Sequence, residues 1–489
     1  MDSKNIKLTF TYFFFLLFVS FKGNSQSTLS AAVDPKIAAV ENNLCGPVNI
    51  IGQGSWNILD RMEHYKTKGV SIAVIDNYEV QWVKAYGFAD DKEKTPATTS
   101  TRFQAASISK SINAIGIMQL VEKELLDLDA DINTNLKSWQ FPYNAKITAG
   151  PISTRQLLSH TGGLSTSGFN GYVKAKKLPS VTQILDGKKP ANSDPVRSIA
   201  KPGEAFRYSG GGVTMTQLMV EDITGLSYAD YIQKQVLEPL GMTQSFYGKD
   251  KNVKSSDLAS GHWYSGNRMK NNYNTYPEQA AAGLWTTPTD LAKFIIELQK
   301  TLKGTSDELL NTASLKELTT PVLDNHSTAL GFFIDDRAGA KYFEHSGSNE
   351  GFTCHYYGSM EGGKGLVVMT NSEAYHIIGE IINSITKTYE WENFYNNTPR
   401  KMIELEESEL QPLLGTYTFE SGNQITIAQE RGTLYLSTEH TDRLDIHPES
   451  NRFFFMLYAD EQVEFVEKDG KMELHFHRDG LVHVAERED

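Results

Sequence analysis

The residues best suited to chemistry are a serine and a lysine three positions apart. Ser107 and Lys110 lie in an apolar stretch, residues 103–121, that is rich in isoleucine, alanine and glycine. Its apolar residues recur every three to four positions, which predicts a buried helix with Ser107 at its N-terminus. Residues three apart share a helix face, so the lysine amine is expected beside the serine hydroxyl. A serine becomes a strong nucleophile when a neighbouring base takes its proton, and a partly desolvated lysine can be that base.

By itself this pattern is weak evidence, because a serine three residues before a lysine is common by chance. The alternative is a serine that caps a helix, followed by a lysine whose amine is solvated. The catalytic interpretation therefore depends on further polar groups that converge on the same place.

One such group is a tyrosine on a glycine-rich turn. Residues 206–212 place Tyr208 two positions before three consecutive glycines, and glycines let a backbone approach a site closely. A tyrosine there can share a proton with Lys110, and its phenolate can act as the base when cations stabilise it. Taken alone, Tyr208 is equally well explained as a core residue.

A second group lies in residues 343–352, which are predicted to form a strand that ends in a polar, glycine-rich edge. This edge contains His345, Ser346, Gly347 and Ser348. A backbone N–H of the edge, together with that of Ser107, can form the oxyanion hole that a tetrahedral intermediate needs. His345 is expected to share a proton or to contact a substrate carboxylate, and the alternative is a histidine in a turn.

In this order and spacing, these stretches resemble the motifs of the β-lactamase and penicillin-binding-protein superfamily of serine acyl-transfer enzymes. The likeness is strongest to the branch that holds class C β-lactamases, D-alanyl-D-alanine carboxypeptidases, D-aminopeptidases and related esterases. Three more segments match this branch: residues 157–164, 237–242 and 282–287. The resemblance covers about residues 55–390.

The resemblance implies a role for each matching residue. Ser107 matches the acylated nucleophile, Lys110 the lysine that takes or shuttles its proton, and Tyr208 the tyrosine of the Y-x-N motif. His345, Ser346 and Gly347 match the K-T-G motif. Ser348 then matches the residue that supplies the second oxyanion N–H. What this implies is two-step acyl transfer: Ser107 attacks a carbonyl, water releases the acyl group, and no cofactor is needed.

The sequence departs from the family pattern at two positions. Gly210 stands where Y-x-N has an asparagine, whose carboxamide would bind a substrate amide. His345 stands where the K-T-G motif has a lysine, and a histidine is only partly charged near neutral pH. Both changes argue against efficient β-lactam hydrolysis, but they leave the nucleophile, its base and the oxyanion hole in place.

The expected function is therefore that of an exported serine hydrolase acting on a small amide, peptide or ester. The export signal slightly favours a D-amino-acid peptide, while the missing asparagine favours a carboxylesterase of the same fold. A non-hydrolytic ligand-binding or sensor protein is the alternative from another class. A third possible function is that of a synthetic acyl transferase that uses an amine in place of water.

The N-terminus carries the expected export signal. Lys4 and Lys7 precede an apolar run at residues 8–21, which has the length of a secretory signal and is short for a membrane span. Residues 1–26 are predicted to be a signal peptide, with a periplasmic or extracellular mature protein and no stable membrane span after signal removal. The alternative is an uncleaved N-terminal anchor.

The order of predicted elements indicates an α+β fold. One helix is predicted to start with a capping box at Ser153 and to end at Gly162 and Gly163. Another is predicted to start at the Thr287 cap, with proline at the first helical position, and residues 164–206 are predicted to be a long loop. Strands are predicted at residues 69–75 and 80–86 and again between residues 330 and 369, with helices between them. This pattern favours one antiparallel sheet fed from both ends of the domain, and the resemblance implies the β-lactamase/transpeptidase-like arrangement. The predicted hydrolase domain spans residues 27–395, and a linker spans residues 396–410.

The C-terminal segment, residues 411–489, has a different pattern. Six short alternating strands are predicted at residues 415–419, 424–428, 433–437, 452–457, 462–466 and 472–477. They indicate a small antiparallel β-barrel or sandwich, which resembles the lipocalin-like appendage of some members of the branch. We expect it to restrict substrates or to support the structure.

Composition excludes several functions. The net charge of −13 over 489 residues, without a basic run, argues against a nucleic-acid partner. The histidines are scattered and the chain has no C-x-x-C or H-E-x-x-H motif, so no metal site is predicted. Cys45 and Cys354 can pair in an oxidising compartment, but sequence separation does not decide this. The expected partner is a small-molecule or peptide substrate, and homo-oligomerisation is left open.

Overall fold

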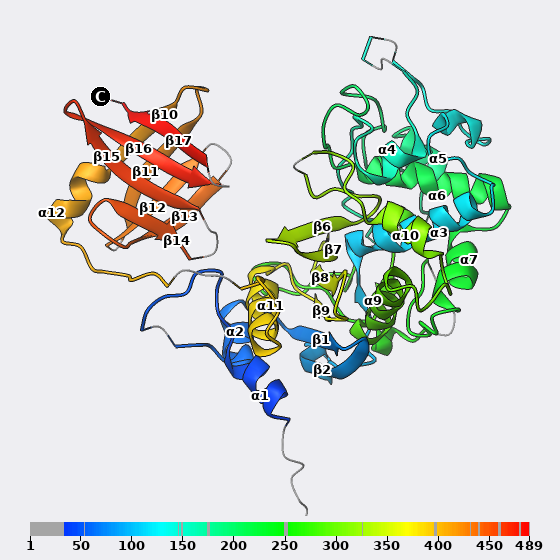
Figure 1. The fold of residues 1–489 in the computed structure, drawn as a ribbon, viewed down its shortest axis with the longest axis horizontal. Coiled ribbons are helices and arrows are strands. Elements are labelled where there is room, and N and C mark those ends of the chain that lie inside the picture. The colour runs from blue at the N-terminus through cyan, green and yellow to red at the C-terminus, as the bar shows by residue number, and fades with distance from the viewer. Residues whose placement is uncertain are drawn as a thin grey trace, which may run out of the picture.

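The computed structural model describes residues 34–488, except residues 53, 145, 148–149, 174–176, 249–252, 325, 396–398, 431, 439–440, 458–460 and 479–480. The predicted signal peptide, residues 1–26, lies outside the described residues. The described chain forms two bodies, a large one of helices and sheet and a smaller C-terminal barrel (Figure 1). Within the described residues, no helix is long and apolar enough to cross a membrane.

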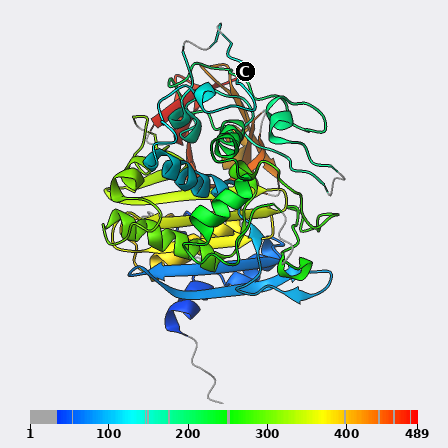
Figure 2. The same cartoon turned by 90° about the vertical axis from the view of Figure 1, so that its right-hand side faces the viewer.

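The large body is built on a seven-stranded antiparallel sheet in the order β3-β2-β1-β9-β8-β7-β6. Its strands are β1 (Gly69–Asp76), β2 (Glu79–Asp90), β3 (Thr95–Pro96), β6 (Phe333–Arg337), β7 (Ala340–Asn349), β8 (Phe352–Ser359) and β9 (Gly365–Thr370). β1 pairs with β9, so that Val70 lies opposite Thr370, and Figure 2 shows the blue N-terminal strands beside the yellow ones. This arrangement confirms the predicted α+β sheet fed from both ends.

The sheet separates two hydrophobic cores, because successive side chains of a strand point to opposite faces. In β1, Ala73 and Ile75 belong to the core shared with the central helices, whereas Ile72 and Val74 belong to the core on the other face. β1 is buried on both faces, which explains its nearly continuous apolar sequence.

The first face of the sheet is covered by the helices between the two groups of strands. These are α3 (Ser109–Glu122), α4 (Thr154–Leu158), α5 (Val181–Leu185), α6 (Gly210–Thr224), α7 (Tyr228–Ile232), α8 (Gln279–Ala282), α9 (Pro288–Leu302) and α10 (Thr312–Leu318). The predicted start of α4 is confirmed by a capping box at Ser153, and that of α9 by the Thr287 cap with proline at the first helical position. α4 ends at Leu158, ahead of the predicted glycines, because His160 adopts a positive φ of 58°.

The opposite face is covered by α1 (Pro35–Asn42), α2 (Ile58–His64) and α11 (His376–Thr388). A buried ion pair joins α2 to α11. The Arg61 guanidinium donates to both oxygens of Glu380, at 2.7 Å from Nε and 2.5 Å from Nη2. The Tyr65 hydroxyl donates to the same carboxylate at 2.7 Å. Because these groups satisfy one another, the charges can be buried between the helices.

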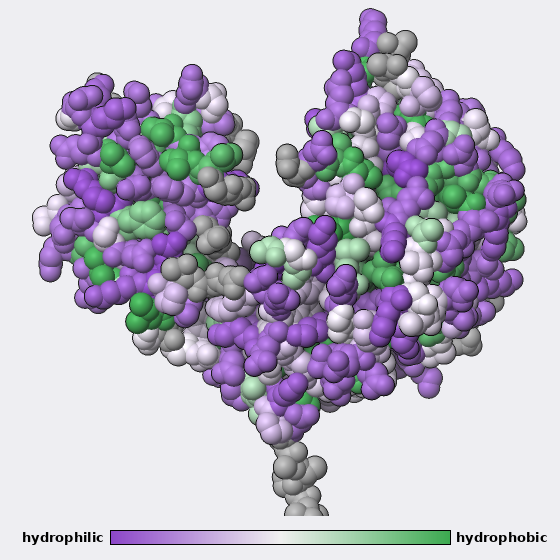
Figure 3. Space-filling model, viewed as in Figure 1, coloured by the Kyte–Doolittle hydropathy of each residue, from purple (hydrophilic) through white to green (hydrophobic). Residues whose placement is uncertain are grey.

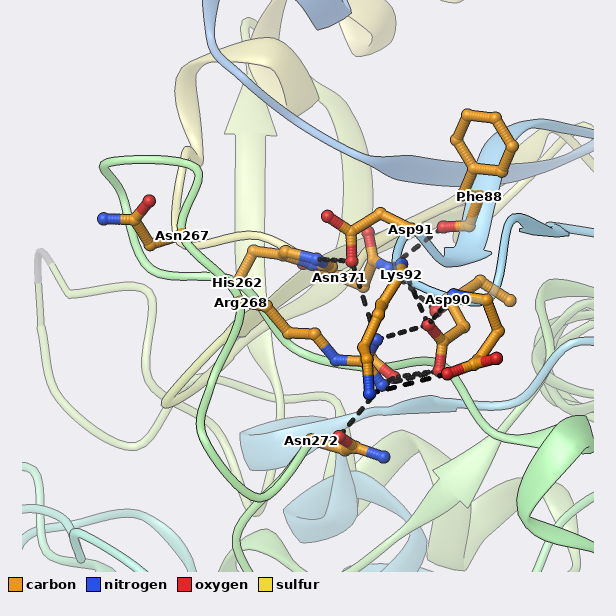
Figure 4. Close-up of polar contacts among 12 residues, drawn as sticks. Phe88, Asp90, Asp91, Lys92, His262, Asn267, Arg268, Asn272 and Asn371 are labelled. Carbon is orange, nitrogen blue, oxygen red and sulfur yellow. Dashed lines mark hydrogen bonds and ion pairs between the residues drawn. The ribbon is translucent and has the colours of Figure 1, made fainter.

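A polar cluster fixes a long loop against the end of β2 (Figure 4). Arg268 binds the Asp90 carboxylate, with Nη2 2.6 Å from Oδ2, and also donates to Asn272 at 2.9 Å. The buried His262 ring lies between the Asn371 carbonyl oxygen, at 3.0 Å, and Asp91, at 3.1 Å. The cluster therefore holds residues 260–272 against the end of β2 and the residue that follows β9.

The C-terminal body is a closed eight-stranded barrel with its own apolar core. Its strands are β10 (Gly415–Phe419), β11 (Gln424–Glu430), β12 (Thr433–Thr438), β13 (Thr441–Pro448), β14 (Phe453–Met456), β15 (Gln462–Lys468), β16 (Lys471–Arg478) and β17 (Leu481–Arg487), preceded by the short α12 (Glu407–Leu410). The predicted small antiparallel barrel is confirmed. β13 and β17 were not predicted; β13 is rich in charged residues and ends in proline, and β17 has exposed apolar residues.

The segment between the two bodies runs extended and contacts both. Ile51 donates its backbone N–H to the Arg400 carbonyl at 2.9 Å, and Ile403 donates to the Pro448 carbonyl at 3.0 Å. The Arg400 side chain pairs with Glu449 on the barrel at 2.6 Å. In space-filling view, a hollow separates the barrel from the large body above this segment (Figure 3).

Candidate active site

Ser107 and Lys110 are in direct contact. The Lys110 Nζ lies 2.9 Å from the Ser107 Oγ and 2.7 Å from the Ala281 carbonyl oxygen, and Lys110 is 2% exposed. Ser107 lies in a 3-10 turn, Ala106–Ile108, immediately before α3, and not in the helix itself. The predicted juxtaposition is therefore present, while the predicted helix begins two residues later than expected.

The turn that carries Ser107 has a strained backbone. Ala106 adopts a φ of 47°, a conformation that is unfavourable for a residue with a Cβ. Ser109 fixes this turn from the following helix: its hydroxyl donates to the Ala106 carbonyl at 2.6 Å and accepts from the Leu284 N–H at 3.0 Å. Surrounding contacts therefore maintain the strained conformation of the turn. The Ser107 side chain on this turn is partly exposed to solvent.

Tyr208 stands next to the lysine. The Lys110 Nζ lies 4.9 Å from the centroid of the Tyr208 ring, which is within the range of a cation–π contact. The structure thus brings Tyr208 to the Ser107–Lys110 pair as predicted.

The His160 ring packs against the Tyr208 ring. The two ring centroids are 4.2 Å apart, and His160 Nδ1 accepts a hydrogen bond from the Ser209 N–H at 3.1 Å. Burial, followed by the charge of Lys110, holds the pKa of His160 well below its ordinary value, so the ring is neutral. No role was predicted for His160 from the sequence; its place in the matched segment 157–164 was the available signal.

The backbone around Gly210, where the Y-x-N motif has its asparagine, is closely packed. A Cβ added at Gly210 would lie 3.1 Å from the Ser167 carbonyl oxygen and 3.2 Å from the Phe169 ring. A side chain at this position would therefore be in tight contact with the loop at residues 167–169.

The end of β7 forms the other wall of the site. β6 pairs with β7 only as far as Glu344, so residues 345–349 present a free strand edge that packs on the 3-10 turn of Ser107. A Cβ at Gly347 would lie 2.6 Å from the Cys354 Sγ and would also meet the Ala105 carbonyl. Glycine at this position therefore allows the strand to approach the nucleophile turn.

The side chains of β7 alternate between two faces. His345 and Gly347 are buried, whereas Ser346 and Ser348 are exposed on the opposite face. Four residues of this strand were predicted to belong to the site. The side-chain positions of two of them, His345 and Gly347, face the nucleophile turn. Ser346 and Ser348 are adjacent to the site through their backbone.

His345 is neutral, which corrects the expectation of a partly charged histidine. The ring is 2% exposed, and its Nδ1 lies 2.6 Å from the Ser346 carbonyl oxygen, so Nδ1 carries the proton. Burial, with a smaller contribution from Lys110, lowers the pKa of His345 to about 3. The Nε2 atom has no hydrogen-bond partner among the described residues. A neutral ring offers no charge to a substrate carboxylate, and it leaves Nε2 as a proton acceptor.

A chain of amide contacts braces β7 against the strand that precedes Ser107. Asn349 donates to the Gln104 side chain at 2.8 Å, and Gln104 donates to the Asn274 carbonyl at 2.7 Å. Gln104 belongs to the short strand β4 (Phe103–Gln104), which pairs with β5 (Trp285–Thr286). The contacts fix the distance between the two walls of the site.

Glu278 is a buried acid beside the site that sequence reasoning missed. It precedes α8 and lies three residues before Ala281, the residue whose carbonyl contacts Lys110. Its side chain is 0% exposed, and neither carboxylate oxygen has a partner among the described residues. Burial raises the pKa of Glu278 to about 7.

Within the described part of the chain, no group of three or more histidine, cysteine or acidic side chains is placed to hold a metal ion. Cys45 and Cys354 are both free thiols. Cys354 is buried next to Gly347, and burial raises the pKa of its thiol.

Comparison with known proteins agrees with the geometry. The family model described as Beta-lactamase matches residues 57–376, and the chain belongs to this family. Protein flp of Staphylococcus aureus (strain MRSA252) is 27% identical over 63% of this chain and 60% of its own length. The chain thus spans about three fifths of that relative. Penicillin-binding protein 4* of Bacillus subtilis (strain 168) is 24% identical over 82% of this chain and 91% of its own.

Solved structures share the fold. The octameric penicillin-binding protein homologue from Pyrococcus abyssi superposes with a TM-score of 0.61 at 24% identity and covers 88% of this chain and 98% of its own. The D-amino acid amidase from Ochrobactrum anthropi SV3 superposes with a TM-score of 0.57 at 22% identity, over 73% of this chain and 100% of its own. These likenesses establish a penicillin-binding-protein-like fold for the chain.

Proposed function

We propose that this chain is an exported serine hydrolase that performs two-step acyl transfer on a small amide, peptide or ester, with a D-amino-acid derivative favoured. The observation that carries the proposal is the 2.9 Å contact between a partly exposed Ser107 hydroxyl and a buried Lys110 amine. Membership of the Beta-lactamase family and the fold shared with a D-amino acid amidase support it.

In the first step, the Ser107 Oγ attacks the substrate carbonyl carbon while the Lys110 amine accepts the hydroxyl proton. The developing oxyanion is bound by the backbone N–H groups of Ser107 and Ser348. Tyr208, beside the amine, passes the proton to the leaving nitrogen or oxygen as the acyl bond breaks. In the second step, a water molecule attacks the acyl-enzyme, its proton returns through the same groups, and Ser107 is restored.

The leading proposal is tested by comparing hydrolysis of D-alaninamide and D-phenylalaninamide with that of p-nitrophenyl acetate. The protein is assayed as wild type and as Ser107→Ala. The proposal expects amide turnover by the wild type and none by the variant. Equal turnover by both proteins would show that the reaction does not use Ser107.

A carboxylesterase is the second candidate, and the environment of Gly210 favours it. Glycine at this position offers no carboxamide to bind a substrate amide, and Ser167 and Phe169 pack tightly against it. Turnover of p-nitrophenyl acetate with no detectable amide hydrolysis would support this candidate over the amidase.

Export and assembly remain proposals with separate tests. Export rests on the predicted signal peptide at residues 1–26, and cell fractionation with N-terminal sequencing of the mature protein tests it. Homo-oligomerisation is suggested by the octameric homologue from Pyrococcus abyssi. Light scattering during size-exclusion chromatography measures the mass of the particle in solution. The mass of a monomer would contradict homo-oligomerisation.

A further inference from the structure

A cavity lies on the far side of the strand that borders the nucleophile turn. Its volume is about 540 Å³, and it is an open pocket bordered by the end of β7, by β8 and by α11. This volume is within the range of small-molecule sites in proteins. α11 lies on the barrel side of the sheet in Figure 1.

The cavity begins at the oxyanion strand itself. Ser346, Gly347 and Ser348 all line it. The two serine side chains point into it because alternate residues of a strand face opposite ways. The backbone of residues 346–348 is thus shared: one side borders the Ser107 turn, and the other side forms a wall of the cavity. A substrate bound along this edge would extend a substituent into the cavity.

The walls away from β7 are mostly apolar. Tyr357 and Phe394 supply aromatic surface, and Ile378 and Ile382 supply aliphatic surface from α11. Such walls suit an apolar ligand group, since they offer area to bury and little hydrogen bonding.

Three of the charged side chains at the walls are in ion pairs, and a fourth, Glu373, accepts a hydrogen bond from the Tyr264 backbone N–H at 3.1 Å. Glu380 is held by Arg61. His355 Nε2 lies 2.8 Å from Glu344, and Arg337 pairs with Asp335 at 2.8 Å. These charged side chains already have partners within the protein, so they do not favour an ionic ligand.

A glycine on α11 keeps the cavity open. Gly379 lines it from the first turn of the helix, and a Cβ added there would meet no atom within 4 Å. Alanine is more favourable than glycine inside a helix, and here neither the space nor a positive φ requires glycine. The missing side chain instead leaves room in the cavity wall.

We propose that this cavity is a specificity pocket of the Ser107 site. It receives an aromatic or branched aliphatic group of the substrate while the scissile carbonyl lies between Ser107 and Ser348. The inference rests on the proposed hydrolase function and adds the chemical class of group that the substrate carries.

The test narrows the pocket from the helix side. Gly379→Leu places an isobutyl group in the cavity, and Gly379→Ala is the matched control that changes the backbone preference with little filling. Two ester pairs are assayed with the full chain. p-Nitrophenyl acetate and p-nitrophenyl phenylacetate differ on the acyl side, and methyl acetate and benzyl acetate differ on the alcohol side.

We expect Gly379→Leu to lower kcat/KM for the bulky member of one pair about tenfold or more relative to its small partner. Gly379→Ala should leave the ratio close to that of the wild type. The pair that responds identifies the side of the carbonyl that occupies the pocket. An unchanged ratio in both pairs would overturn the proposal.

A binding measurement separates this proposal from the hydrolase function. Ser107→Ala and the double variant Ser107→Ala/Gly379→Leu are titrated with N-acetyl-D-phenylalaninamide and followed by ligand-observed NMR. Saturable binding to the first protein and its loss in the second support the pocket even where the wild type hydrolyses none of the esters. Equal binding to both, or binding to neither, contradicts the pocket.

Discussion

Lys110 has one side-chain amine and two neutral oxygen partners, Ser107 and the Ala281 carbonyl. No carboxylate is among these partners, so the amine is not locked into an ion pair by them. This arrangement is what the proposed mechanism needs from a base.

Replacing Lys110 by methionine should lower kcat/KM for p-nitrophenyl acetate by about 10²- to 10⁴-fold, the usual contribution of a positioned general base. The methionine keeps most of the side-chain volume while removing the amine. Thermal unfolding of the variant serves as the control for folding. A variant with wild-type activity would mean that another group takes the Ser107 proton.

The raised pKa of Glu278 predicts how the stability of the folded protein depends on pH. Its pKa is raised from the ordinary 4.5 to about 7 in the folded protein. Between about pH 4.5 and 7 the unfolded chain therefore loses this proton while the folded chain keeps it, so stability falls as pH rises and stays low above pH 7. At about 1.4 kcal/mol per pKa unit, the change corresponds to about 3 kcal/mol.

Glu278→Gln removes this titration. The variant should gain stability relative to the wild type as the pH is raised from 4.5 to 8, by up to about 3 kcal/mol. Urea unfolding of both proteins at the two pH values measures the difference. A difference between the proteins that does not depend on pH would show that Glu278 titrates normally.

At the residue scale, the sequence predicted what depends on local spacing. Ser107 and Lys110 meet because three residues make about one turn. His345 was expected to be partly charged, since its burial depends on how the strand packs against a distant helical layer, which no local pattern reports. Glu278 carried no signal, because one glutamate before an alanine-rich segment is ordinary on a surface.

Among the elements, α11 is fixed by an ion pair that is almost fully buried. Arg61 of α2 and Glu380 of α11 have side chains that are 10% and 2% exposed. Charges removed from water in this way stabilise the fold only while both are present. The contribution of the pair to the stability of the fold is therefore seen mainly when one partner is removed.

Glu380→Ala should destabilise the protein by about 3–5 kcal/mol, because it leaves the buried Arg61 guanidinium without its counter-charge. Lys201→Ala is the matched control; it breaks a pair with Glu204 whose side chains are more than half exposed. That change should alter stability by about 0–1 kcal/mol. Chemical denaturation measures both, and equal effects would contradict this account of α11.

Element starts were easier to predict than element ends. Ser153 and Thr287 cap their helices as the sequence indicated, because capping is a contact within four residues. The end of α4 was placed too late, since it depends on the backbone conformation of His160. α5 lies within the stretch that was predicted to be a long loop; five residues give too short a pattern to detect.

At the scale of the whole molecule, the barrel is separate from the sheet. Its core is built from its own strands and from Leu410 and Leu413, and it shares no residue with the other two cores. The described contacts between the bodies run mainly through the segment around Arg400. Such an arrangement favours independent unfolding of the two bodies.

Differential scanning calorimetry of the full chain should therefore show at least two transitions. The smaller one is assigned to the barrel by a destabilising change in its core, Phe465→Ala, which should lower that transition by several degrees and leave the other in place. A single transition whose calorimetric and van't Hoff enthalpies agree would show that the bodies unfold together.

The sheet could be predicted from alternating strands at both ends of the domain, together with the resemblance to a known family. Strands β13 and β17 could not be predicted, since β13 is rich in charged residues and β17 has exposed apolar residues. Their pairing is set by neighbouring strands. The cavity behind β7 was also beyond prediction, because it is formed by segments that the fold brings together from distant parts of the sequence.

The central claim is that Ser107 is an activated nucleophile. Intact-mass spectrometry after treatment with a fluorophosphonate probe tests it most directly, with Ser107→Ala treated in parallel. We expect one adduct on the wild type and none on the variant. No adduct on the wild type, or the same adduct on both proteins, would contradict it.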